Sequence, residues 1–286
     1  MALDHSLVGV ASEPVERTWC ADDVILYALG VGAGAPDPTA ELAFTTENTA
    51  GVELRVLPTF GVLAAQARTG RRLGDFDPAK LVHAEQAFEL HAPLPVDGRV
   101  RVVSTVTGIA DKGSGALVTT ENTATDADTG KPLVTSRSGV FIRGEGGFGR
   151  SGPSSEPWEL PERAPDEQVR YATRPEQALL YRLSGDRNPL HADPAFAARG
   201  GFPRPILHGL CTYGFTGRAL LHALCGSDPD RFDAMSGRFT RPVLPGQELV
   251  VSIWDDGPGG GAGSALFRTT TDDGTVAIDR GRVRFH

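Results

Sequence analysis

The chain has 286 residues, of which 40% are apolar and 22% charged. This length and composition are enough to form one large hydrophobic core, or two cores that are each the size of a domain. The net charge of −8 and the lack of a dense Lys/Arg cluster exclude a general nucleic-acid-binding protein, because a phosphate backbone selects a basic surface. The first 14 residues lack the apolar core of a signal peptide, and no stretch approaches 18 uninterrupted apolar residues. Three widely spaced cysteines imply no disulfide framework. We therefore expect a cytoplasmic protein that does not span a membrane.

The first block of elements extends to about Arg143. A helix is predicted over residues 20–29, and an apolar stretch at helical spacing follows over residues 60–68. Alternating apolar and polar residues then predict four strands. These strands cover residues 81–91, 99–109, 116–125 and 133–142.

A linker rich in glycine, serine and proline is predicted over residues 144–157. The second block, from about Glu167, repeats the order of the first, with helices over 175–183 and 210–224. Its strands cover residues 235–241, 248–254, 266–271 and 276–285. A repeat with a period near 150 residues indicates duplication, and each copy has the pattern of a helix wrapped by antiparallel strands. We expect an α+β fold with domains at 1–150 and 151–286.

The densest group of reactive side chains lies at residues 181–193. Asp186 and His191 lie on either side of Pro189, which prevents a helix from continuing through them, so both are expected on an irregular segment. Further along the chain, His208 and Gly209 lie where the glycine-rich helix begins. A helix start has free N–H groups and the positive end of the dipole, which suit a developing oxyanion. We expect His208 to cap this helix, with a second catalytic histidine as the alternative.

Residues 181–191 resemble the signature of the R-specific enoyl-CoA hydratases of the MaoC-like group. The resemblance continues along the sequence. Nearly the whole chain is similar to the double-hotdog hydratase module of multifunctional peroxisomal β-oxidation enzymes. The further matching motifs are residues 27–33, 57–61, 111–115, 146–149, 201–212 and 238–247.

The resemblance implies two hotdog halves that share one sheet, with a complete active site only in the second half. The first half would have lost its own dyad and would accommodate a long or bulky acyl chain. The sequence agrees, because no Asp-x-Asn-Pro-x-His motif precedes residue 186. The implied reaction is hydration of an enoyl-CoA to the (3R)-hydroxyacyl-CoA, without cofactor or metal. A homodimer is expected, because hotdog sheets commonly associate edge to edge.

The implied catalytic residues are Asp186, His191, Asn188 and Gly209. Hydration needs one group to take a proton from water and one to give a proton to the α-carbon, which a carboxylate and an imidazole can do together. Asn188 would orient His191 or the water. The N–H of Gly209 would stabilise the enolate oxygen, a contribution of roughly 10²–10³-fold in rate.

Four further residues match substrate-contacting positions of the family. Lys112 lies in a glycine-flanked turn that would meet the CoA phosphates, or it is a plain turn lysine. His83 and Phe239 would line the ligand, although Ala84 replaces the glycine that usually follows the histidine. Glu47 matches a carboxylate that matters in the family, or it is a solvated loop acid.

Three rivals stay open from the sequence. The same site run backwards would be a 3-hydroxyacyl-thioester dehydratase acting on an acyl-carrier protein. A hotdog thioesterase would need a carboxylate or glutamine on the central helix, and residues 210–224 contain none. The chain could also be a non-catalytic half of a hetero-oligomer, which the intact dyad argues against. A metal site is not expected, because the histidines and acids lack typical zinc spacing.

Overall fold

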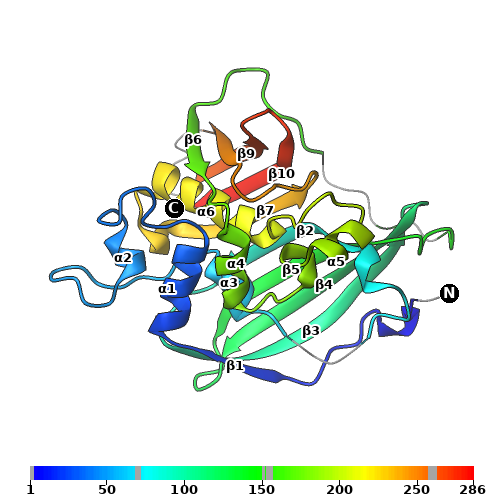
Figure 1. Ribbon diagram of the computed structural model, residues 1–286. Helices are drawn as coiled ribbons and strands as arrows, with labels where there is room; N and C mark the ends of the chain where they lie inside the picture. Colours follow the sequence, from blue (N-terminus) through cyan, green and yellow to red (C-terminus); the bar gives the residue numbers. More distant parts are fainter. Residues whose placement is uncertain (1–2, 68–71, 150–151, 153–156, 257–262) are drawn as a thin grey trace.

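The computed structural model describes residues 3–67, 72–149, 152, 157–256 and 263–286 (Figure 1). Within these ranges one antiparallel sheet runs through the whole molecule in the order β1-β3-β4-β5-β2-β7-β10-β9-β8-β6. The strands are β1 (Val15–Trp19), β2 (Leu81–Leu90), β3 (Gly98–Asp111), β4 (Gly115–Asp126), β5 (Pro132–Arg143), β6 (Glu167–Ala172), β7 (Phe232–Phe239), β8 (Glu248–Asp255), β9 (Gly263–Thr271) and β10 (Val276–Phe285).

The sheet order shows the duplication directly. The first half has the order β1-β3-β4-β5-β2, and the second half has the equivalent order β6-β8-β9-β10-β7. The two halves join where β2 pairs with β7, with Gln86 opposite Gly237. This is a double hotdog, and the predicted α+β class is confirmed. The boundary predicted between residues 150 and 151 lies outside the described residues.

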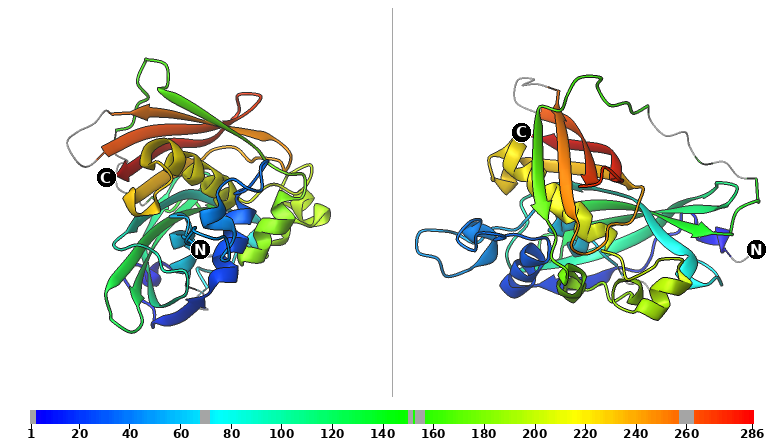
Figure 2. Two further views of the ribbon diagram at one scale, coloured as in Figure 1. Left: turned by 90° about the vertical axis from the view of Figure 1, so that its left-hand side faces the viewer. Right: turned by 45° about the horizontal axis from the view of Figure 1, so that its top comes forward.

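The long helix α6 (Gly209–Cys225) forms the centre of the second half. Twelve of its 17 residues are buried, and it lies beneath the orange and red strands of that half in Figure 2. Two glycines let segments of the first half approach it closely. A Cβ on Gly214 would lie 2.4 Å from Val31 Cγ1, and one on Gly217 would lie 2.3 Å from Thr59 Cγ2. The helix is therefore packed between both halves of the molecule.

The first half differs from the expected pattern. The helix predicted over residues 60–68 is only α3 (Phe60–Ala64), which is fully buried against the sheet. The apolar run ends at Ala65 and the sequence continues with Gln66 and a polar segment, so a further helical turn would have to bury polar groups. The prediction of a long central helix in each half is wrong for the first half. The other helices are α1 (Ala21–Gly30), α2 (Leu42–Thr45), α4 (Gln177–Tyr181) and α5 (Pro194–Arg199).

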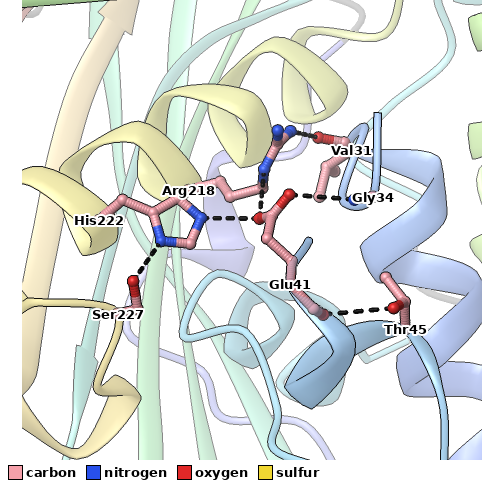
Figure 3. A network of polar contacts seen from close by, with 7 residues as sticks. All are labelled: Val31, Gly34, Glu41, Thr45, Arg218, His222 and Ser227. Carbon is pink, nitrogen blue, oxygen red and sulfur yellow. Dashed lines mark hydrogen bonds and ion pairs between the residues drawn. The ribbon is translucent and has the colours of Figure 1, made fainter. Parts of the chain in front are cut away.

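A buried ionic network ties the first half to α6 (Figure 3). The Arg218 side chain, 2% exposed, donates from Nε to Glu41 Oε1 at 2.8 Å and from Nη1 to the Val31 carbonyl at 2.7 Å. The same Glu41 oxygen lies 2.7 Å from His222 Nε2, and its other oxygen accepts from the Gly34 N–H. The Glu41 carboxylate thus joins α2 and the loop after α1 to the C-terminal half of α6.

Candidate active site

Asp186 and His191 lie on an irregular segment, as predicted. Helix α4 passes into a 3₁₀ turn that ends at Gly185, whose φ of +123° is accessible chiefly to glycine. Asp186 Oδ1 then accepts from the Asn188 N–H at 3.0 Å, and Asn188 Oδ1 accepts from the Leu190 N–H at 3.0 Å. Asn188 therefore caps the short 3₁₀ turn that carries His191, and it positions the histidine through the backbone.

His191 is held in one tautomer. Its Nδ1–H donates to the Ile206 carbonyl at 2.9 Å, and because a carbonyl can only accept, the proton must be on Nδ1. The lone pair of Nε2 is then free to take a proton. The ring is 8% exposed, and burial lowers its pKa, so the imidazole is neutral near pH 7.

His208 is the residue whose role the sequence misjudged. It occupies the N-cap position of α6, but its side chain makes no capping bond, so the predicted capping role is wrong. Instead its Nε2–H donates to the backbone carbonyl of Asp186 at 3.2 Å. Its ring also stacks on His191, with centroids 3.7 Å apart and planes at 26°. The signal that could have identified it is a histidine directly before the glycine that begins the central helix.

Asp186, His191 and His208 each bring a potential ligand atom within 4.8 Å of the others. Such a group could be considered for metal binding. The two rings are stacked with planes at 26°, however, and one nitrogen of each ring donates its proton to a backbone carbonyl, which leaves one unprotonated nitrogen on each ring. This arrangement suits proton transfer to a small molecule better than it suits coordination.

Gly209 is the first residue of α6, and its N–H is one of the donors that a helix start leaves without an intrahelical acceptor. A Cβ at this position would lie 3.3 Å from Phe239 Cε1. Glycine therefore lets the Phe239 ring lie directly over the helix start. The Phe239 ring is in turn 4.9 Å from the ring of His83 on β2. The structure thus brings Gly209, Phe239 and His83 together.

His83 owes its orientation to a β-bulge. The pairing of β2 with β5 shifts between His83 and Glu85, which leaves Ala84 as the extra residue, and bulges commonly re-aim side chains next to sites. The His83 Nε2–H donates to the Glu85 carbonyl at 3.0 Å. Burial lowers the pKa of His83 to about 4, while the nearby Asp186 charge opposes that shift. The His83 imidazole is therefore uncharged near pH 7 and lies near the dyad.

The structure places Glu47 on a different segment of the chain from the dyad. Glu47 is exposed in the chain that follows α2, and α2 is tied to His222 in the last turns of α6. His222 is 13 residues from Gly209, or about 20 Å along the helix axis. The reading of Glu47 as a solvated loop acid fits this position better than direct substrate contact.

Lys112 is exposed at the tip of the β3–β4 hairpin. Leu81 at the start of β2 pairs with Ile142 of β5, which pairs with Ala116 of β4. The hairpin tip is therefore at the same end of the sheet as His83. Contact between Lys112 and a CoA phosphate remains a prediction that this position permits.

Comparisons with known proteins identify the two halves separately. Residues 18–144 match the MFE-2 hydratase 2 N-terminal domain, and residues 158–276 match the MaoC like domain. The chain is 44% identical to 3-hydroxyacyl-thioester dehydratase Y of Mycobacterium tuberculosis, over 100% of this chain and 99% of the relative. It is 47% identical to enoyl-CoA hydratase ChsH3 of the same organism, over 89% and 90% of the two chains.

A solved structure agrees with these matches. The crystal structure of a MaoC-like dehydratase from Phytophthora capsici superposes with a TM-score of 0.86 at 31% identity, covering 98% of this chain and 96% of that one. Fold, motif and sequence similarity therefore agree along both halves. The chain belongs to the MaoC-like hydratase and dehydratase family, in the group whose first half is an MFE-2 hydratase 2 N-terminal domain.

Proposed function

We propose that the protein is an (R)-specific enoyl-CoA hydratase, a hydro-lyase that reversibly adds water to a trans-2-enoyl-CoA to give the (3R)-3-hydroxyacyl-CoA. The observation that carries the proposal is a neutral His191, with Nε2 unprotonated, whose ring lies close to the Asp186 carboxylate beside the start of α6. The relative named enoyl-CoA hydratase ChsH3 supports the same reaction.

In the proposed reaction, Asp186 and His191 together hold one water molecule. The water oxygen bonds to C3 of the enoyl group as a proton passes to C2 on the same face, so the pair regains its initial protonation state after each turnover. The thioester oxygen gains negative charge during this step, and the N–H of Gly209 donates to it. A positioned acid or base typically contributes about 10²–10⁴-fold in rate.

We infer that the enzyme accepts long or bulky acyl groups. The second half encloses the 17-residue α6, whereas the first half has the five-residue α3 in the equivalent place. A shorter helix leaves more of the inner sheet surface of the first half for an acyl chain. A series of enoyl-CoA substrates of increasing length tests this inference, because kcat/KM should rise beyond crotonyl-CoA. A maximum at crotonyl-CoA would contradict it.

Two substitutions test the proposed chemistry. Asp186→Asn and His191→Ala should each lower the hydration rate of enoyl-CoA by at least ~10²-fold while circular dichroism shows a folded protein. The exposed residues Asp97 and His91, at the opposite end of β2 from His83, provide matched controls, and Asp97→Asn and His91→Ala should keep wild-type rates. Near-wild-type rates in both site variants would overturn the mechanism.

The same assay separates the rival functions. Helix α6 carries no carboxylate or glutamine, and release of free CoA without hydration would be needed to support a thioesterase. The relative named 3-hydroxyacyl-thioester dehydratase Y favours a second candidate, dehydration of a 3-hydroxyacyl thioester. Comparing kcat/KM for the CoA and acyl-carrier-protein thioesters distinguishes the two. Activity of the purified single chain excludes a non-catalytic half.

We also propose a cytoplasmic homodimer. No helix of the described part of the chain is long and apolar enough to cross a membrane, and all three cysteines are free thiols, which suits a reducing compartment. Strands β1 and β6 end the sheet and offer edges for association. Sedimentation analysis tests the dimer, and a mass of one chain at micromolar concentration would exclude it.

A further inference from the structure

His208 is more completely buried than either member of the proposed dyad. It is 1% exposed, against 8% for His191, while Asp186 is half-buried. Its ring contacts two others, with centroids 3.7 Å from that of His191 and 5.0 Å from that of Tyr181. Its side chain donates a hydrogen bond to the backbone carbonyl of Asp186. The contacts of His208 are therefore directed at both catalytic residues.

The protonation state of His208 follows from its surroundings. Nε2 must carry a proton, because the Asp186 carbonyl can only accept. Nδ1 is buried and has no hydrogen-bond partner among the described residues, so a proton there would be a buried N–H with no acceptor. Burial, followed by the neighbouring His191, lowers the pKa of His208 to about 3. The ring is therefore a neutral Nε2–H imidazole throughout the working pH range.

The backbone around Asp186 needs such a fixed point. Gly185 precedes it with a positive φ, and a 3₁₀ turn follows it, so no regular helix or strand holds this carbonyl. His208, in contrast, directly precedes the 17-residue α6, the longest helix of the second half, and 12 residues of that helix are buried. The Nε2–H bond connects this irregular segment to the start of the buried helix.

We propose that His208 is a positioning residue for hydration: it fastens the Asp186 backbone to the start of α6 and supports the His191 ring by stacking. This inference rests on the proposed hydratase function. His208 transfers no proton itself. Its contribution is the placement of the carboxylate and imidazole relative to each other, and misplacement of reacting groups by about 1 Å can cost about 10²-fold in rate.

Paired amide variants test which nitrogen matters. In His208→Gln the side-chain amide can reach the position of Nε2 and restore the N–H donor, whereas in His208→Asn the amide reaches only the position of Nδ1. We expect His208→Ala and His208→Asn to lose roughly 10²-fold in kcat with KM changed less than about threefold. His208→Gln should recover to within about tenfold of the wild type. His222→Gln, at the far end of the same helix, is the control and should keep wild-type kcat.

The pH profile separates positioning from proton transfer. His208→Gln should show the same limbs in kcat/KM against pH as the wild type, because the titrating dyad is unchanged. Loss of a limb, or activity as low as in the alanine variant, would overturn the proposal and indicate a proton-transfer role. Rescue by asparagine but not glutamine would also overturn it, because Nδ1 would then be the important atom. Wild-type kcat in His208→Ala would leave no positioning role.

An independent measurement does not require turnover. Nitrogen-15 NMR of labelled histidine should show His208 as the neutral Nε2–H tautomer and His191 as the Nδ1–H tautomer near pH 7. An Nδ1–H form of His208 would contradict the proposal even if hydration is confirmed. If instead the wild-type protein hydrates no enoyl thioester while the NMR result holds, the proposed function fails and the geometry of His208 stands.

Discussion

The buried carboxylate of Glu41 provides the most quantitative prediction. Replacing it with alanine removes three partners at once: the guanidinium of Arg218, the ring of His222 and the N–H of Gly34. Because Arg218 is only 2% exposed, its charge would be left buried without its carboxylate. Breaking a buried ion pair in this way costs about 3–5 kcal/mol of unfolding free energy. We expect Glu41→Ala to be destabilised by this amount.

Urea unfolding at pH 7 measures the effect. With an m-value of about 3 kcal/mol/M, the unfolding midpoint should fall by about 1–1.7 M. The exposed Glu53, in the chain that follows α2, is the matched control, and Glu53→Ala should shift the midpoint little. The double variant Glu41→Leu with Arg218→Met should be more stable than Glu41→Ala, because no buried charge is left unpaired. A cost of under about 1 kcal/mol for Glu41→Ala would refute the reasoning.

The stabilisation that the Glu41 carboxylate provides depends on pH with a definite sign. Burial alone would raise the pKa of Glu41, but the hydrogen bond with His222, the charge of Arg218 and the Gly34 N–H together lower it below its usual value. A lowered folded-state pKa stabilises the protein above the unfolded pKa of about 4.3 and loses that stabilisation as the pH falls through the folded value. The difference in stability between wild type and Glu41→Gln should therefore be complete at pH 7 and shrink below about pH 4. A difference independent of pH would contradict the assignment.

Two further predictions concern the active site. Burial lowers the pKa of His191, and a base must be neutral, so the acid limb of kcat should have its midpoint below the ordinary histidine value of about 6.5; a midpoint above pH 7 would contradict a neutral buried base. Gly209→Ala places a Cβ 3.3 Å from the Phe239 ring, which crowds the space over the helix start. It should lower kcat/KM by about tenfold with an unchanged melting temperature, and an unchanged kcat/KM would show that the ring simply moves aside.

The sequence alone determined the features that depend on neighbouring residues. Strand alternation predicted β2–β5 and β7–β10 to within a few residues, because a half-buried strand repeats every two residues. Proline and glycine around Asp186 predicted an irregular catalytic segment for the same local reason. Strands β1 and β6 were not predicted, because these short edge strands bury few side chains, and their exposed positions obscure the alternation.

The tertiary structure alone decided what depends on distant residues. The junction of the halves pairs β2 with β7, about 150 residues apart, and no local pattern specifies that partner. The five-residue length of α3 depends on what the sheet beneath it can bury, and helical periodicity does not contain that limit. His208 precedes the helix like a cap, but only the folded chain brings the Asp186 carbonyl within reach of its Nε2–H. The motif thus indicates the candidate catalytic residues, and long-range packing decides how they are held.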